Sequence, residues 1–111
     1  MLFCLTVDYT PQSVAAFRDN PNINRRQAID QLLEAAGGKV VDMYHTSATG
    51  PGALVIFDVP DPEMAPAITG VATAAGTIHN PRLTRLYTMD EIKSVRQKAA
   101  RIHGAYRAPG R

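Results

Sequence analysis

The sequence has one cysteine, Cys4, among its 111 residues. A lone thiol cannot form a disulfide within the chain, which fits a reducing compartment, so we expect a cytoplasmic protein. The first residues lack the basic segment and the longer apolar core that a signal peptide needs. Their apolar run has the length of a strand, far below the ~20 residues that cross a bilayer. No membrane partner is therefore expected.

Acidic residues are absent after Glu91. Residues 92–111 carry six basic residues, whereas residues 1–91 carry six basic and all ten acidic residues, a net charge of −4. We expect the main domain over 1–91, followed by a C-terminal helix and basic tail over 92–111. The tail suits phosphate contacts. Because its one aromatic residue is Tyr106 and the rest of the chain is acidic, nucleic acid is not an expected partner.

Metal-ligand spacings are also missing, since the chain has neither a His-x-x-x-His motif nor paired cysteines. We therefore expect no metal and no cofactor. A nucleophilic role for Cys4 would need a neighbouring base to lower the pKa of its thiol. A small, buried hydrophobic side chain is the more usual role for such a cysteine.

The remaining composition, 45% hydrophobic and 20% charged, is that of one globular domain. Alternation of Phe3, Leu5 and Val7 with polar residues predicts a strand over 2–9. Capping residues, glycines and apolar periodicity place the other elements. The predicted helices cover 11–18, a stretch that resumes after an interruption at Asn20-Pro21-Asn22 and ends before Gly37, 62–75 and 88–103. The predicted strands cover 39–46, 53–59 and 77–87.

This order predicts an α+β, ferredoxin-like βαββαβ domain with an antiparallel sheet in the order 4-1-3-2. Pro81 cannot donate to a neighbouring strand, so the last strand should be an edge or carry a bulge. Both main helices should cover one face of the sheet. The other face would expose Leu54, Ile56 and Leu86, which favours a second copy, sheet against sheet.

The last predicted helix has an apolar stripe at spacings of 3, 4 and 3, formed by Ile92, Val95, Ala99 and Ile102. We expect this stripe to dock on the barrel or on a partner, with its cations outward.

Several segments resemble the GYD-domain family over roughly residues 3–98. They are Val7-Asp8-Tyr9-Thr10-Pro11, Asn20-Pro21, Arg25-Arg26-Gln27-Ala28, Glu34 with Gly37-Gly38-Lys39, Tyr44, Pro60-Asp61, Ala75-Gly76 and Leu86-Tyr87-Thr88-Met89-Asp90-Glu91. The family is similar to the dimeric α+β barrels, which include cofactor-free monooxygenases, lactone isomerases and haem enzymes. The resemblance implies a homodimer or higher oligomer.

The chain departs from this family at the signature that names it. Where the family has glycine, tyrosine and aspartate in the hairpin after the second strand, this sequence reads Thr49-Gly50-Pro51-Gly52-Ala53. A role that the family gives to that aspartate therefore does not transfer to this chain.

The topology brings the chain's polar groups to one rim of the sheet, where acid–base chemistry becomes feasible. We predict catalytic roles for Asp8, Tyr44 and His79, and ligand-binding roles for Cys4, Thr6, Asp42 and His45. The glycine-rich loop above this rim could act as a lid. Alternation predicts that Val41, Met43 and His45 face one side of the sheet while Val40, Asp42 and Tyr44 face the other.

Two interpretations of function remain open. In the first, facing sheets of an oligomer enclose an interior that binds or transforms a small molecule. In the second, the chain is a non-enzymatic assembly or partner-binding module that acts through its C-terminal helix and basic tail. The rim residues would then be polar only because they meet water.

Overall fold

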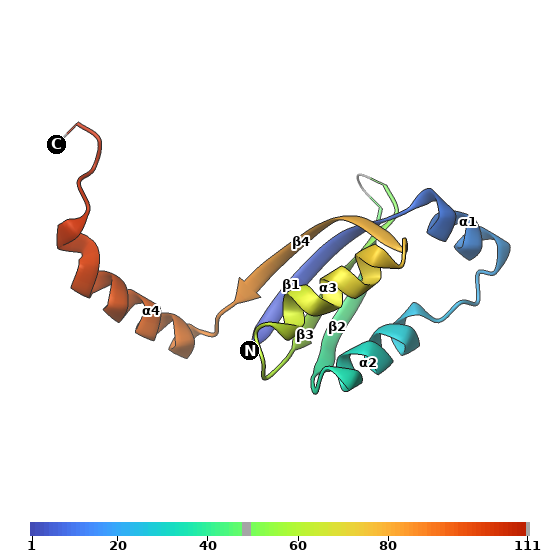
Figure 1. Cartoon of the computed structure of the whole chain (residues 1–111), viewed down its shortest axis with the longest axis horizontal. Coiled ribbons are helices and arrows are strands. Elements are labelled where there is room, and N and C mark those ends of the chain that lie inside the picture. Colours follow the sequence, from blue (N-terminus) through green and yellow to red (C-terminus); the bar gives the residue numbers. More distant parts are fainter. Residues whose placement is uncertain (48–49, 111) are drawn as a thin grey trace.

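The computed structural model describes residues 1–47 and 50–110. Its elements follow the expected order, with α4 beginning a little before residue 92 (Figure 1). They are β1 (Leu2–Tyr9), α1 (Pro11–Asp19), α2 (Arg25–Ala35), β2 (Lys39–Thr46), β3 (Gly52–Asp58), α3 (Met64–Ala74), β4 (Ile78–Leu86), α4 (Met89–Ile102) and the 3-10 turn η1 (His103–Ala105).

The four strands form one antiparallel sheet in the order β2-β3-β1-β4, which confirms the predicted α+β, ferredoxin-like topology. Thr10 caps α1 by accepting a hydrogen bond from the Ser13 backbone, and Pro11 occupies the first turn, where a missing N–H costs nothing. Gly37 follows the C-cap of α2 and has a φ of 76°. Glycine adopts this left-handed conformation freely, so Gly37 lets the chain leave the helix. Local sequence signals therefore set these boundaries.

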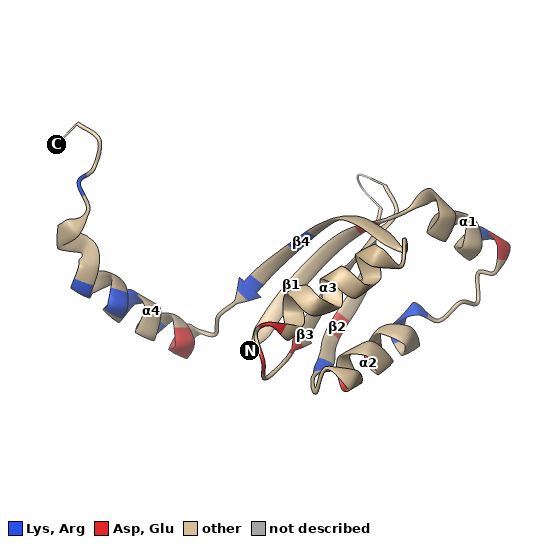
Figure 2. Ribbon diagram, viewed as in Figure 1, with Lys and Arg blue, Asp and Glu red and all other residues tan. Residues whose placement is uncertain are grey.

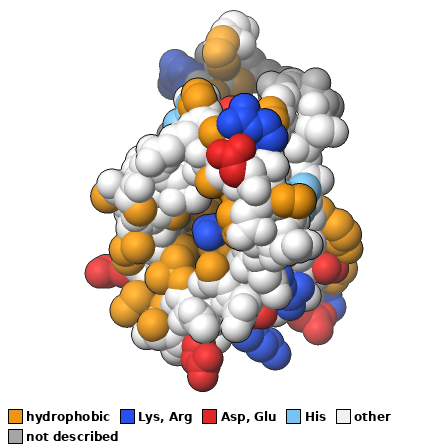
Figure 3. Space-filling view, turned by 90° about the vertical axis from the view of Figure 1, so that its right-hand side faces the viewer, with side chains coloured by type: hydrophobic (Ala, Val, Ile, Leu, Met, Phe, Trp, Pro, Cys, Tyr) orange, Lys and Arg blue, Asp and Glu red, His pale blue; other side chains and the backbone are white. Residues whose placement is uncertain are grey.

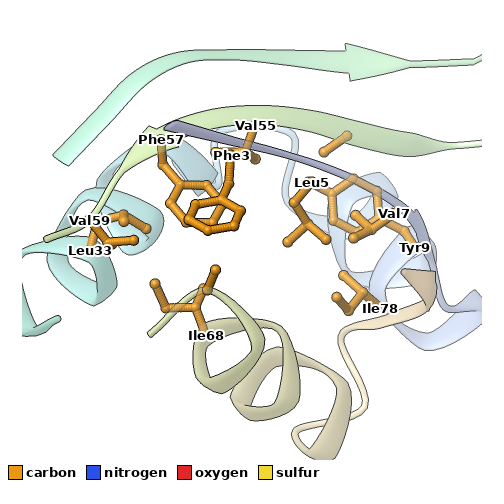
Figure 4. Packing of buried hydrophobic residues seen from close by; sticks show 12 residues of the cluster. Phe3, Leu5, Val7, Tyr9, Leu33, Val55, Phe57, Val59, Ile68 and Ile78 are labelled. Atoms are coloured by element: carbon orange, nitrogen blue, oxygen red, sulfur yellow. The ribbon is translucent and has the colours of Figure 1, made fainter. Parts of the chain in front are cut away.

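The core lies between the sheet and the helices (Figure 4). Alternate residues of β1 are buried, and Phe3 stacks on Phe57 with ring centroids 5.7 Å apart. Leu33 of α2 and Ile68 of α3 close the core from the helical side. Each such side chain contributes roughly 1.5–3 kcal/mol by leaving water, so this layer holds the sheet in place.

The other residues of the inner strands form the open face of the sheet. Cys4 lies opposite Ile56 and Thr84, and Thr6 lies opposite Leu54 and Arg82. Leu2 and Leu86, which pair with each other, extend this half-buried apolar surface to the other end. In the described part of the chain, no helix packs over this face.

The predicted alternation along β2 is wrong at its start. The pairing of β2 with β3 shifts between Val40 and Asp42, so the strand carries a bulge. A bulge inserts one residue and reverses the faces before it. Val40 therefore packs against the core together with Met43, whereas Val41 is 49% exposed.

The expectation that the last helix docks is not met within one chain. None of the residues of α4 is buried, and its main contacts in the part of the chain that the structure describes are with η1, which follows it directly in sequence. Figure 1 shows α4 leaving the domain as an arm. The arm extends the molecule along its longest dimension, and the whole measures 58 × 35 × 23 Å.

Within residues 1–47 and 50–110, no helix has the length and apolar character needed to cross a membrane.

Candidate functional site

Asp8 and His79 pair across the rim of the open face. Asp8, near the end of β1, lies opposite Gly52 of β3 and opposite His79 of β4. The pairing of β1 with β4 shifts between Thr6 and Asp8, so β4 is both an edge strand and irregular beside Pro81, as expected. Such irregularities redirect the side chains next to them.

Asn80 links these two residues. Its φ is 51°, a left-handed conformation that asparagine tolerates better than most residues. Its Nδ2 donates to Oδ2 of Asp8 at 3.3 Å and lies 3.3 Å from Nδ1 of His79. When Nδ1 accepts from Asn80, the ring proton is on Nε2, where it can be donated to a bound molecule.

A polar pocket of about 330 Å³ opens beside this group. It combines a carboxylate, a guanidinium, an amide and two hydroxyl groups, from Asp8, Arg82, Asn80, Thr6 and Thr46, and Val7 completes the lining. The predicted site set did not include Asn80 or Arg82. The Asn80-Pro81 dipeptide at the start of an edge strand was the available signal, because Asn-Pro favours turns and irregular backbone.

Asp42 and Tyr44 form a second polar group on the open face. They lie opposite Ile56 and Leu54, and the Tyr44 hydroxyl donates to Oδ2 of Asp42 at 2.9 Å. This hydrogen bond and the negative charge of Asp42 raise the pKa of Tyr44 above its ordinary value of 10.0, so its hydroxyl stays protonated at neutral pH. Because β1 and β3 separate β2 from β4, one chain does not join Tyr44 to His79.

The two other predicted ligand-binding residues of β1, Cys4 and Thr6, lie on the open face between these groups. His45 does not share it. Its ring centroid is 6.0 Å from that of Tyr9, a residue of the buried face. His45 therefore lines a shallow pocket with Tyr9 and Phe17, away from Asp8 and His79.

A smaller cavity of about 40 Å³ lies between the sheet and the helices. Its lining is apolar apart from Arg25, Tyr9 and Thr77, and Nε of Arg25 has no hydrogen-bond partner among the described residues. Figure 3 views the molecule from the side of α1 and α2, where hydrophobic side chains surround a hollow.

Burial raises the pKa of Tyr9, and the charge and hydrogen bonding of Arg25 partly oppose this. A volume of 40 Å³ holds a few water molecules, whereas small-molecule sites usually measure several hundred Å³. The rim pocket is the roomier of the two candidates by the same measure.

Residues 1–47 and 50–110 hold no group of three or more His, Cys, Asp and Glu side chains arranged to bind a metal. The predicted lid includes Ala48 and Thr49, which lie outside the described residues.

Comparison with known proteins identifies the family. The model of the GYD domain matches residues 3–95. The chain belongs to the GYD-domain family. Its hairpin nevertheless lacks the tyrosine and aspartate of the family signature, as the sequence shows. No curated protein matches the chain.

Among solved structures, the chain is similar to 5-chloro-2-hydroxyhydroquinone dehydrochlorinase from Burkholderia phenoliruptrix, in complex with 2,5-dihydroxybenzoquinone. The TM-score is 0.55 with 19% sequence identity, and the match covers 81% of this chain and 97% of the dehydrochlorinase chain. At this identity the similarity establishes a shared fold.

Proposed function

We propose that this GYD-domain protein binds a small polar molecule on the open face of its sheet, in an interior closed by a second copy. The observation that carries the proposal is the array of Asp8, Asn80 and His79 beside a pocket of about 330 Å³. Left-handed backbone at non-glycine residues gathers at functional sites, because it persists only where its surroundings enforce it. The apolar residues Leu54 and Ile56 give the second copy a surface to cover.

Three groups at the rim have roles in this proposal: Asp8 and Arg82 line the pocket, and His79 lies beside it, opposite Asp8. Asp8 accepts a proton or a hydrogen bond from the bound molecule, and His79 donates from Nε2. Arg82 offsets negative charge that develops on the ligand. A second copy would bring its own Tyr44 and Asp42 to the same interior, so the predicted residues that are far apart in one chain would meet across the interface.

A polyhydroxylated benzene is the probe that suits this pocket. Its hydroxyl groups donate to Asp8 and accept from Arg82, while its ring lies on the apolar part of the face. The dehydrochlorinase of similar fold is named for a chlorinated hydroxyhydroquinone, which supports this class of ligand. We therefore choose hydroxyhydroquinone, kept under argon because it oxidises in air.

The test is an NMR titration of the isotope-labelled full chain with hydroxyhydroquinone. We expect shifts at the amides of Thr6, Asp8 and His79, and at least tenfold weaker binding for Asp8→Asn, equivalent to about 1.4 kcal/mol. Asp30→Asn removes an exposed carboxylate on α2 and is the matched control, expected to bind as the wild type. Shifts at Arg25 and Tyr9 instead, or equal affinity of Asp8→Asn and wild type, would refute the rim site.

The exposed apolar stripe of α4 favours a second role, assembly through the C-terminal helix and basic tail. This role is compatible with ligand binding, because α4 lies apart from the rim pocket (Figure 1). The cytoplasmic location stays a prediction from the lone cysteine.

A further inference from the structure

The arm formed by α4 presents apolar surface that its own chain leaves uncovered. Val95 is 41% exposed and Ile102 is 70% exposed, and both belong to the stripe with Ile92 and Ala99. An amphipathic helix normally buries this stripe. A surface that covers it must therefore be sought outside the arm.

Local contacts fix the direction in which α4 leaves the domain. Thr88 and Glu91 form a capping box, with hydrogen bonds of 3.0 and 3.1 Å between each side chain and the other residue's backbone. Arg85 then ties this first turn to β4, because its guanidinium bonds Glu91 at 3.1 Å and lies 4.5 Å from the ring centroid of Tyr87. These contacts favour the extended arm, so we take another chain as the partner of its stripe.

The exposed side of α3 offers a matching surface. α3 contains no charged residue, and it buries Ala65 and Ile68 against the core. Its outer side exposes Met64 and Val71, with Ala67 and Ala74 beside them. These four positions have spacings of 3, 4 and 3, the same as the stripe of α4, and each stripe is about 15 Å long at 1.5 Å per residue.

The charges around the two stripes are complementary. Arg96 and Lys98 flank the stripe of α4, and Lys93 and Arg101 lie on its outer side. Asp61 and Glu63 precede α3, within a domain of net charge −4 (Figure 2). An antiparallel arrangement brings the C-terminal end of the basic α4 to the start of α3, where Asp61 and Glu63 lie, and also opposes the two helix dipoles favourably. Opposite charges of this kind set orientation and partner choice.

We propose that α4 of one copy packs antiparallel on the exposed side of α3 of a second copy. The proposal rests on the assembly role above and names its surface and its partner. It is independent of the ligand site, because neither stripe includes a residue of the rim pocket.

Disulfide trapping between two variants tests this contact, with Cys4→Ser as the background. One chain carries Val95→Cys and the other, which bears a tag, carries Val71→Cys. We expect the mixture to form a cross-linked heterodimer under mild oxidation. The tag on one chain gives this heterodimer a mass different from that of either homodimer. Gln97→Cys mixed with Thr73→Cys is the control, because these residues lie on other sides of the same helices. Equal cross-linking of the two mixtures would overturn the proposal.

A chain with both Val95→Cys and Val71→Cys separates the remaining alternatives. Closure of its disulfide within one chain, at monomer mass, would show that α4 folds back on its own α3 and would also overturn the proposal. Sedimentation should give at least tenfold weaker self-association for Val95→Asp and no change for Gln97→Asp. If Val95→Asp associates as the wild type and the tail binds a DNA oligomer, the arm is a nucleic-acid contact instead.

The titration with hydroxyhydroquinone is then repeated on Val95→Asp. If Val95→Asp still binds hydroxyhydroquinone while its self-association is weakened, the ligand site and the contact between α3 and α4 are independent of each other. Pairing through the open face does not use Val95, so Val95→Asp should keep that pairing and lose the larger assembly. An assembly of unchanged size in Val95→Asp would count against the contact between α3 and α4.

Discussion

Asn80 holds the rim together through one amide group and one unusual backbone angle. Its φ of 51° turns the side chain toward Asp8 and His79, which the register places opposite each other. The pairing of Asp8 with His79 could be predicted, because the strand order brings the end of β1 to the start of β4. The role of Asn80 could not be predicted, because strand alternation does not describe where the side chain of a residue at an irregular pairing points.

Replacing Asn80 separates its two contributions. Asn80→Gly removes the amide and keeps a residue that adopts positive φ freely, whereas Asn80→Ala removes the amide and strains the backbone. We expect the free energy of unfolding, measured by urea denaturation, to be about 1 kcal/mol lower for Asn80→Ala than for Asn80→Gly. Equal free energies would mean that the backbone at this position relaxes without cost, and the rim would not be a rigid site.

The elements themselves were largely predictable, because their ends are set by local chemistry. The capping box of Thr88 and Glu91, Pro11 in α1 and the position of Pro81 are all visible in the sequence and are all found in the structure. The bulge in β2 was not predictable, since Val40 and Val41 are both suited to the core. The undocked state of α4 was not predictable either, because an apolar stripe does not reveal which surface will cover it.

The first turn of α4 should depend on pH through Glu91. Hydrogen bonds from the Thr88 backbone and from Arg85 lower the pKa of Glu91 below its ordinary value of 4.5. A lowered pKa in the folded state means that the cap stabilises the helix above the unfolded value and is lost as pH falls through the folded value. Hydrogen exchange at the amides of Glu91 and Ile92 should therefore become less protected only below pH 4.5.

The Thr88→Ala variant controls this test. Without the threonine hydroxyl, the Glu91 amide loses its acceptor, and caps of this kind contribute about 1 kcal/mol. We expect roughly fivefold faster exchange in the first turn at neutral pH, as this energy implies. If protection in wild type falls already above pH 4.5, the pKa of Glu91 is not lowered and the corner at Arg85 is weaker than described.

At the scale of the whole molecule, two surfaces remain uncovered in the single chain. The open face carries apolar residues together with Asp8, Asp42 and Tyr44, and the arm carries its own stripe. The contact between α3 and α4 leaves the open face free, so it does not substitute for the pairing of sheets. The proposed interior therefore exists only if a second copy covers the open face.

Cys4 reports on that covering directly, because it is the one cysteine of the chain and lies on the open face opposite Ile56. The measurement is the rate at which its thiol reacts with a disulfide reagent over a range of protein concentrations. We predict that the rate falls as concentration rises, and that Ile56→Asp, which places a charge in the apolar face, removes this dependence. A wild-type rate that is the same at every concentration would contradict the covered interior, and with it the proposed ligand site.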